Sequence, residues 1–264
     1  MQFDFGKNWA DFSEHALDTD RVKEARDDFT GLLSVAGGLS GKSFLDIGFG
    51  QGLSLLNAAS AGAAVFGIDI NPKCEAVLDS NRRFFPELAR LKIPIAIGSI
   101  LDESIVRRAR EASPSGGGYD IVHSWGVLHH TGDMSRAIQV AASLVNPNGH
   151  LVIAIYNRHW SSRPWLLIKY LYCKSPELLR RLLVWVLTPV IYTAKWIVTK
   201  DQPLKQSRGM DFFYDVVDWV GGYPYEYASI TEVLSLIEPL GFRCVKALQS
   251  RVPTGCNEFV LKRS

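Results

Sequence analysis

The sequence has few cysteines and almost no net charge. Its four cysteines, Cys74, Cys173, Cys244 and Cys256, show no C-x-x-C spacing. That argues against a zinc site or a disulfide framework and fits a reducing cytoplasm. The net charge of +2 gives no global electrostatic signal for nucleic acid. We therefore expect no nucleic-acid partner and no bound metal.

Targeting and membrane signals are also missing. Residues 1–9 lack the basic and then apolar pattern of a signal peptide. No run of about 18 uninterrupted apolar residues predicts a spanning helix. We therefore expect a cytoplasmic protein. Hydrophobic residues make up 47% of the 264 positions, enough for one large α/β domain or for a core with a sizeable insertion.

Short apolar runs alternate with helical patterns through most of the chain. After an amphipathic helical region, strands are predicted at 43–47, 64–68, 94–97, 121–124 and 150–155, with helices near 53–61, 73–85, 102–112 and 133–144. Buried strands separated by helices indicate a parallel, doubly wound sheet. A helix near 229–239 and two apolar runs at 242–248 and 258–262 predict an antiparallel pair at the sheet edge.

The region 159–228 interrupts this alternation and is rich in Trp, Tyr and Leu. Between His159 and Lys200 it has seven Lys or Arg residues and one acid, Glu177. We interpret it first as a lid over an acceptor. Two alternatives stay open: the surface of a homodimer, and a membrane-surface contact through 165–198 that would make the protein membrane-peripheral.

Three glycines at alternate positions, Gly48, Gly50 and Gly52, lie between the first strand and the next helix. Glycine lets the backbone turn tightly and lets a ligand approach without a Cβ in the way. The helix N-terminus offers free N–H groups to that ligand. Asp46 precedes the first glycine, and its carboxylate would repel a pyrophosphate but attract an ammonium group. This difference favours S-adenosylmethionine over a dinucleotide.

Residues 42–155 resemble the core of a class I S-adenosylmethionine-dependent methyltransferase. The resemblance rests on four motifs in order, at 46–52, 67–71, 98–102 and 119–130. Segments 5–9, 207–226 and 255–259 also resemble a bacterial small-molecule subgroup named by analogy with quinone-biosynthesis methyltransferases.

The resemblance implies an α/β fold with a doubly wound, mostly parallel, seven-stranded Rossmann-like sheet and a helical lid insertion. The expected parts are a helical cap at 1–41, a cofactor-binding core at 42–158, the insertion at 159–228, and a C-terminal helix with two strands at 229–264. A nicotinamide-dependent dehydrogenase is the main rival, but it usually has an apolar residue at the position of Asp46.

The resemblance also implies a set of cofactor contacts. Asp46 helps to hold the amino group, Asp69 accepts hydrogen bonds from the ribose hydroxyls, and Ile70 packs on the adenine. Asp102 is a second candidate for the adenine edge. The remaining expected contacts are Gly48, Gly50, Gly52, Ser99, Ile100 and Ser124.

Acceptor-site residues are harder to assign. His129 is the predicted catalytic base, while at least one of His129 and His130 is expected only to pack and cap the following helix. The predicted acceptor contacts are Trp125, Tyr156, Asn157, Arg158, Arg208 and Tyr223. Two interpretations are equally favoured for the acids Asp215, Asp218 and Glu226. They line a polar acceptor pocket, or they form a buried salt-bridged loop that supports the lid.

These observations predict methyl transfer to a small-molecule acceptor, first of all to a hydroxyl oxygen. The segment after the fourth strand, Ser124-Trp125-Gly126-Val127, lacks the Asn/Asp-Pro-Pro-Tyr/Phe motif of adenine and glutamine methyltransferases. N- or C-methylation of a small metabolite stays an alternative. So does a non-catalytic subunit of this fold docked on a membrane or a partner.

Overall fold

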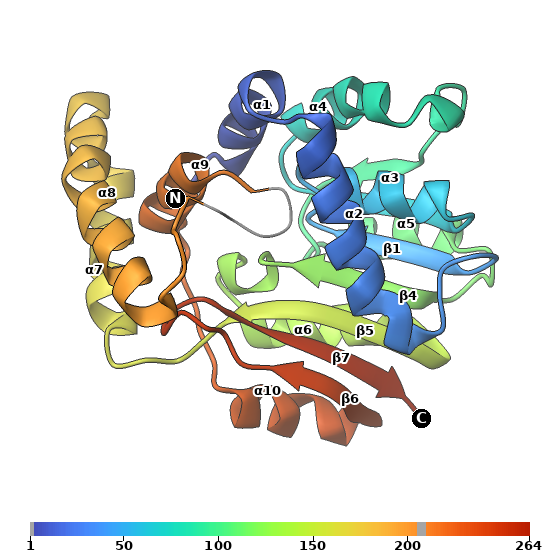
Figure 1. Ribbon diagram of the computed structural model, residues 1–264. Coiled ribbons are helices and arrows are strands. Elements are labelled where there is room, and N and C mark those ends of the chain that lie inside the picture. The colour runs from blue at the N-terminus through green and yellow to red at the C-terminus, as the bar shows by residue number, and fades with distance from the viewer. Residues whose placement is uncertain (1–2, 205–209) are drawn as a thin grey trace.

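The computed structural model describes residues 3–204 and 210–264, and a seven-stranded sheet runs through its centre (Figure 1). The strand order is β3-β2-β1-β4-β5-β7-β6. β7 runs antiparallel to both of its neighbours, and the other pairs are parallel. The strands are β1 (Ser43–Ile47), β2 (Ala64–Asp69), β3 (Ile95–Ile97), β4 (Tyr119–Trp125), β5 (Val145–Tyr156), β6 (Phe242–Leu248) and β7 (Cys256–Arg263). The predicted fold class is confirmed.

Two apolar layers cover the sheet. One contains buried residues of α5 (Glu103–Ala112), α6 (Met134–Ser143) and α10 (Ile230–Ile237). The other contains buried residues of α2 (Thr19–Leu33), α3 (Leu53–Ser60) and α4 (Lys73–Asn81). Every residue of β1 is buried, as expected for a central strand with helices on both faces. Short 3₁₀ turns lie at Ser34–Ala36, Arg82–Phe84, Pro86–Leu88, Leu128–His130 and Glu238–Leu240.

The N-terminal region folds into α1 (Phe5–His15) and α2, as its amphipathic pattern predicted. Asp4 and Asp18 cap these helices by accepting hydrogen bonds from the backbone N–H groups of Lys7 and Arg21. The fully buried Phe12 fixes α1 to the second apolar layer.

The insertion contributes α7 (Ser162–Lys174), α8 (Glu177–Thr199) and α9 (Phe212–Gly221). In Figure 1, α7 and α8 stand at the outer edge of the molecule, and α9 lies between them and the sheet. The three helices share a small apolar cluster of their own, which includes Tyr172, Ile191, Phe212, Val216 and Val220.

One helix has a length and composition that the search for an uninterrupted apolar run did not single out. Helix α8 is long and apolar enough to cross a membrane, judged by length and composition only, and just 6% of its most apolar window is buried in the fold. The sequence criterion did not find this helix because it required an uninterrupted apolar run, whereas α8 reaches a high mean hydropathy with Lys195 inside it.

Candidate active site

A cavity of about 480 Å³ opens at the carboxyl ends of the parallel strands. It lies where the strand order reverses between β1 and β4, the position at which open α/β sheets bind ligands. Its walls come from the glycine turn after β1, the ends of β2 and β4, the start of the chain, and the insertion helices α8 and α9.

The glycine turn forms the floor of this cavity. Gly48 has φ +76° and Gly50 has φ +51°, in the left-handed region that other residues avoid. A Cβ on Gly48 would lie 2.3 Å from the side chain of Val127, and one on Gly50 would lie 3.3 Å from the indole nitrogen of Trp9. Gly52 instead caps the N-terminus of α3 and does not line the cavity.

Asp46 sits at the cavity wall with a partner that sequence reasoning missed. Its Oδ1 lies 2.7 Å from Nδ1 of His123, and both side chains are almost completely buried. The His123 ring stacks between Phe44 and Trp125. The only sequence signal for this partner was a histidine in the fourth strand, which the parallel register places beside Asp46.

Asp69 ends β2 and also lines the cavity. Its carboxylate accepts hydrogen bonds from the backbone N–H groups of Gly50, at 2.9 Å, and Asn71, at 2.8 Å. Burial raises the pKa of this carboxyl, and the two backbone hydrogen bonds oppose that rise. The sequence-predicted Ile70, Ser99 and Ile100 line the same region.

Two other predicted cofactor contacts lie elsewhere. The Ser124 hydroxyl is completely buried and donates to the carbonyl of Ile47, which ties β4 to β1. Asp102 caps α5 by accepting from the backbone N–H of Ser104. Neither residue lines the cavity.

The two adjacent histidines have different surroundings: His129 is enclosed in the fold and His130 lines the cavity. His129 is fully enclosed behind the wall, where its Nδ1 accepts a hydrogen bond from the backbone N–H of Tyr156 at 3.3 Å. Burial lowers its pKa well below the ordinary value. His130 lines the cavity and donates from Nδ1 to the carbonyl of Pro224. The predicted catalytic position of His129 therefore needs correction, because the ring that reaches the cavity belongs to His130.

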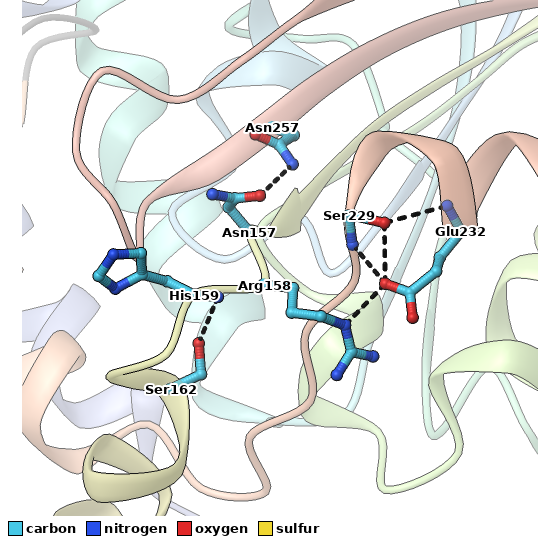
Figure 2. A network of polar contacts seen from close by, with 7 residues as sticks. All are labelled: Asn157, Arg158, His159, Ser162, Ser229, Glu232 and Asn257. Atoms are coloured by element: carbon cyan, nitrogen blue, oxygen red, sulfur yellow. Dashed lines mark hydrogen bonds and ion pairs between the residues drawn. The ribbon is translucent and has the colours of Figure 1, made fainter.

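Asn157 and Arg158 do not line the cavity, and Figure 2 shows the polar contacts of their side chains. The Asn157 side chain accepts from Asn257 at 3.0 Å, and Nε of Arg158 pairs at 2.7 Å with Glu232. Glu232 closes the capping box at the start of α10. These two predicted acceptor contacts thus hold the end of β5 to the C-terminal part.

The remaining predicted acceptor contacts have mixed outcomes. Trp125 and Tyr156 line the cavity. Tyr223 does not, and its ring lies 5.8 Å from that of Tyr170. Arg208 lies outside the residues that the structure describes.

Helix α9 supplies the far wall through Phe212, Asp215, Asp218 and Trp219. Asp218 accepts a hydrogen bond at 2.8 Å from the side-chain amide of Asn8. Burial raises the pKa of Asp215 and raises that of Asp218 well above its ordinary value. The position of Asp215 and Asp218 in the cavity wall favours the acceptor pocket over a supporting loop for these two acids. Glu226 does not line the cavity and accepts a hydrogen bond from the backbone N–H of Met134 at 2.9 Å.

Behind this wall lies a buried cation that the sequence did not single out. Lys169 of α7 is fully buried and donates to the carbonyl of Trp219. Its Nζ lies 4.7 Å from the ring centre of Tyr225 and 5.5 Å from that of Tyr156. Burial lowers the pKa of Lys169 to about 7, although Asp218 acts in the opposite direction.

Residues 19–192 match the family model described as a methyltransferase domain, which is more than half of the chain. The chain belongs to this methyltransferase family. The methyltransferase is 34% identical over 134 residues to the ubiquinone biosynthesis O-methyltransferase of Cronobacter sakazakii, a match that covers 50% of this chain and 49% of that one. Its identity to the enzyme of that name from Vibrio cholerae is 30% over 161 residues, 60% of this chain and 59% of the other. The methyltransferase thus spans about half the length of the relatives it matches.

Solved structures show the same fold at low identity. The methyltransferase superposes on magnesium protoporphyrin IX methyltransferase from Synechocystis PCC 6803 with a TM-score of 0.54 and 18% identity, over 90% of this chain and 82% of that one. For PKMT2 from Rickettsia typhi the TM-score is 0.58 at 15% identity, over 89% and 53% of the two chains. These similarities confirm the predicted Rossmann-like methyltransferase fold.

The cofactor of this family is S-adenosylmethionine, and the cavity of the methyltransferase has groups that fit it. The carboxylates of Asp46 and Asp69 suit an ammonium group and a pair of hydroxyls, and the bare turn at Gly48 allows a close approach. Gln51, which sequence reasoning missed, also lines the cavity. Its Oε1 is buried and has no hydrogen-bond partner within the described part of the chain, so a ligand donor would satisfy it.

Proposed function

We propose that the protein transfers a methyl group from S-adenosylmethionine to a hydroxyl oxygen of a small aromatic molecule in the cytoplasm. One observation carries this proposal: a single cavity joins the cofactor-type wall at Asp46 and Asp69 to a second wall of aromatic rings and carboxyl groups on α9. The relatives named as O-methyltransferases support the choice of oxygen. The free cysteines fit a reducing compartment.

The acceptor half of the cavity suits a flat, mostly apolar molecule. Trp125, Tyr156, Phe212 and Trp219 bring aromatic surface to its wall, and such surface binds aromatic ligands by burial and stacking. The N-terminal residues Phe3, Phe5 and Trp9 line the same cavity. In the proposed reaction these rings exclude water and orient the acceptor for an in-line transfer.

When bound, S-adenosylmethionine supplies an electrophilic methyl group on a sulfonium. The acceptor oxygen must lose its proton as it attacks, which calls for a nearby base. We assign this role to Asp215, whose raised pKa makes it a stronger base than an ordinary carboxylate. Asp218 is already engaged by Asn8. Burial lowers the pKa of His130 to about 3, which makes its ring a weak base.

Two measurements test the proposal. Calorimetric titration should show S-adenosylmethionine binding to the purified chain, and no binding would overturn the enzyme reading in favour of a non-catalytic subunit. Formation of S-adenosylhomocysteine should then be followed with phenols and catechols, and with anilines that place nitrogen at the same position. Turnover of the anilines alone would contradict oxygen as the acceptor atom.

A further inference from the structure

The outer surface of α7 and α8 exposes an unusual amount of apolar side chain. Leu178 is 82% exposed and Trp185 is 75% exposed. Isolated exposed apolar residues are ordinary, but a contiguous apolar surface marks an interaction site. We define the outer face as the exposed residues Leu167, Leu171, Leu178, Leu182, Trp185, Val186, Val190, Trp196 and Ile197.

This face is separate from the side of α8 that packs into the fold. Leu182, Val186, Val190 and Ile197 recur at helical spacing and are exposed. On the opposite side, residues such as Leu187 and Ile191 belong to the apolar cluster of the insertion. Helix α8 is therefore apolar on both sides, and only one of these sides is covered by protein.

Positively charged residues flank the outer face along the sequence. The side chains of Arg163, Lys174, Arg181 and Lys200 are exposed on or next to α7 and α8. Glu177, the single acid between residues 159 and 200, pairs with Arg181 at 3.0 Å. Exposed Trp and Leu side chains flanked by Lys and Arg are typical of helices that lie in the interface of an anionic bilayer.

The contacts of α8 favour a surface position over a membrane span. Ile191 and Lys195 line the cavity, and Ile191 also packs with Phe212 and Val216 in the insertion cluster. If α8 crossed a bilayer it would leave this cluster and remove part of the cavity wall. A position in the membrane interface buries the outer face and leaves the insertion cluster and the cavity wall intact.

The charges also favour a bilayer over a second copy of the chain. A two-fold dimer places the same patch of each subunit against the other. On this face that arrangement would bring two sets of cations together, and like charges in an interface are unfavourable. An anionic lipid surface neutralises them.

We propose that the outer face of α7 and α8 docks the protein on the surface of an anionic lipid bilayer, with α8 parallel to the membrane plane. The apolar side chains enter the headgroup region, and the flanking cations contact lipid phosphates. This docking is separate from methyl transfer, so it can be tested without a known acceptor.

The test is co-sedimentation of the full chain with vesicles of phosphatidylcholine alone or mixed with phosphatidylglycerol. Binding should require the anionic lipid and weaken about fivefold for each exposed cation removed, as in Lys174→Gln or Lys200→Gln. The double variant Leu182→Glu/Trp185→Glu should lose at least about a hundredfold in vesicle affinity. Leu91→Glu, an exposed leucine far along the chain from this face, is the matched control and should bind as the unaltered chain does.

Tryptophan emission, cofactor affinity and sedimentation velocity complete the test of membrane docking. The emission of the tryptophans should shift to shorter wavelength on vesicle binding, and Trp185→Phe/Trp196→Phe should remove most of that shift. S-adenosylmethionine affinity should be unchanged in every outer-face variant, which shows that they fold. Absence of vesicle binding would overturn the proposal. A second combination of results would also overturn the proposal. In it, sedimentation velocity shows a dimer, Leu182→Glu/Trp185→Glu dissociates that dimer, and the variant still binds vesicles.

Discussion

The buried Lys169 makes the stability of the protein depend on pH in a way that can be measured. The ordinary lysine pKa of 10.5 falls to about 7 in the folded chain because of burial. Between these values the unfolded chain binds more protons than the folded one, so this group makes folding more favourable as the pH rises. For the variant Lys169→Met this contribution is absent.

The size of the effect follows from the two pKa values. Integrating the proton difference from pH 7 to pH 9 gives about 2 kcal/mol of added stability from Lys169. Buried thiols such as that of Cys74, whose pKa is raised, act in the opposite direction at high pH. The quantity to compare is therefore the unfolding free energy of the unaltered chain minus that of Lys169→Met.

Urea unfolding at pH 7, 8 and 9 gives this difference directly. It should change by about 2 kcal/mol in favour of the unaltered chain over that range. Lys174→Met, a substitution of an exposed lysine on the same helix, should show no such change. A difference that stays constant with pH for Lys169→Met would refute the depressed pKa and with it the dry environment behind α9.

Four further predictions concern the cavity. Asp69→Ala should weaken S-adenosylmethionine binding by about 1–3 kcal/mol in calorimetry, whereas Asp102→Ala should leave it unchanged; equal affinities would remove the ribose assignment. Asp215→Asn should lower kcat about 10²- to 10⁴-fold at unchanged cofactor affinity, and full activity would exclude it as the base. Gly48→Ala should cost about 1–3 kcal/mol of stability in urea unfolding, because the added methyl would collide with a side chain at 2.3 Å and the backbone has φ +76°; an unaffected midpoint would contradict that packing. Arg158→Gln should keep the rate of methyl transfer and cost less than about 1 kcal/mol of stability, since its ion pair is exposed and outside the cavity; a large loss in kcat would restore it to the acceptor site.

The elements of the fold follow closely from local patterns in the sequence. The first strand is observed at Ser43–Ile47, as predicted, and the helix after it ends at Ser60 instead of 61. The largest error is at β5, which begins at Val145 and not at 150. Val145 pairs with Tyr119 and His150 pairs with Ile121, so residues 146–149 form an irregularity in the ladder to β4, and Asn148 within it has φ +62°.

The candidate site could be predicted only where a short motif carries it. The turn at Gly48 and the acid at Asp69 lie within a strand and its loop, so spacing was enough to place them. The partnership of Asp46 with His123 and the burial of Lys169 against the carbonyl of Trp219 depend on contacts between distant segments. The exchange of His129 for His130 had a related cause, since adjacent residues in a short turn point in different directions and only the packing decides which one faces the ligand.

Ile191 takes part in two structures at once, the apolar cluster of the insertion and the lining of the cavity. The opposite side of α8 carries the exposed residues of the outer face. The outer face is therefore separated from the cavity by the width of one helix. A shift of this helix would change the shape of the cavity without moving the strand ends at Asp46 and Asp69, so the proposed docking face and the acceptor side of the cavity share one helix.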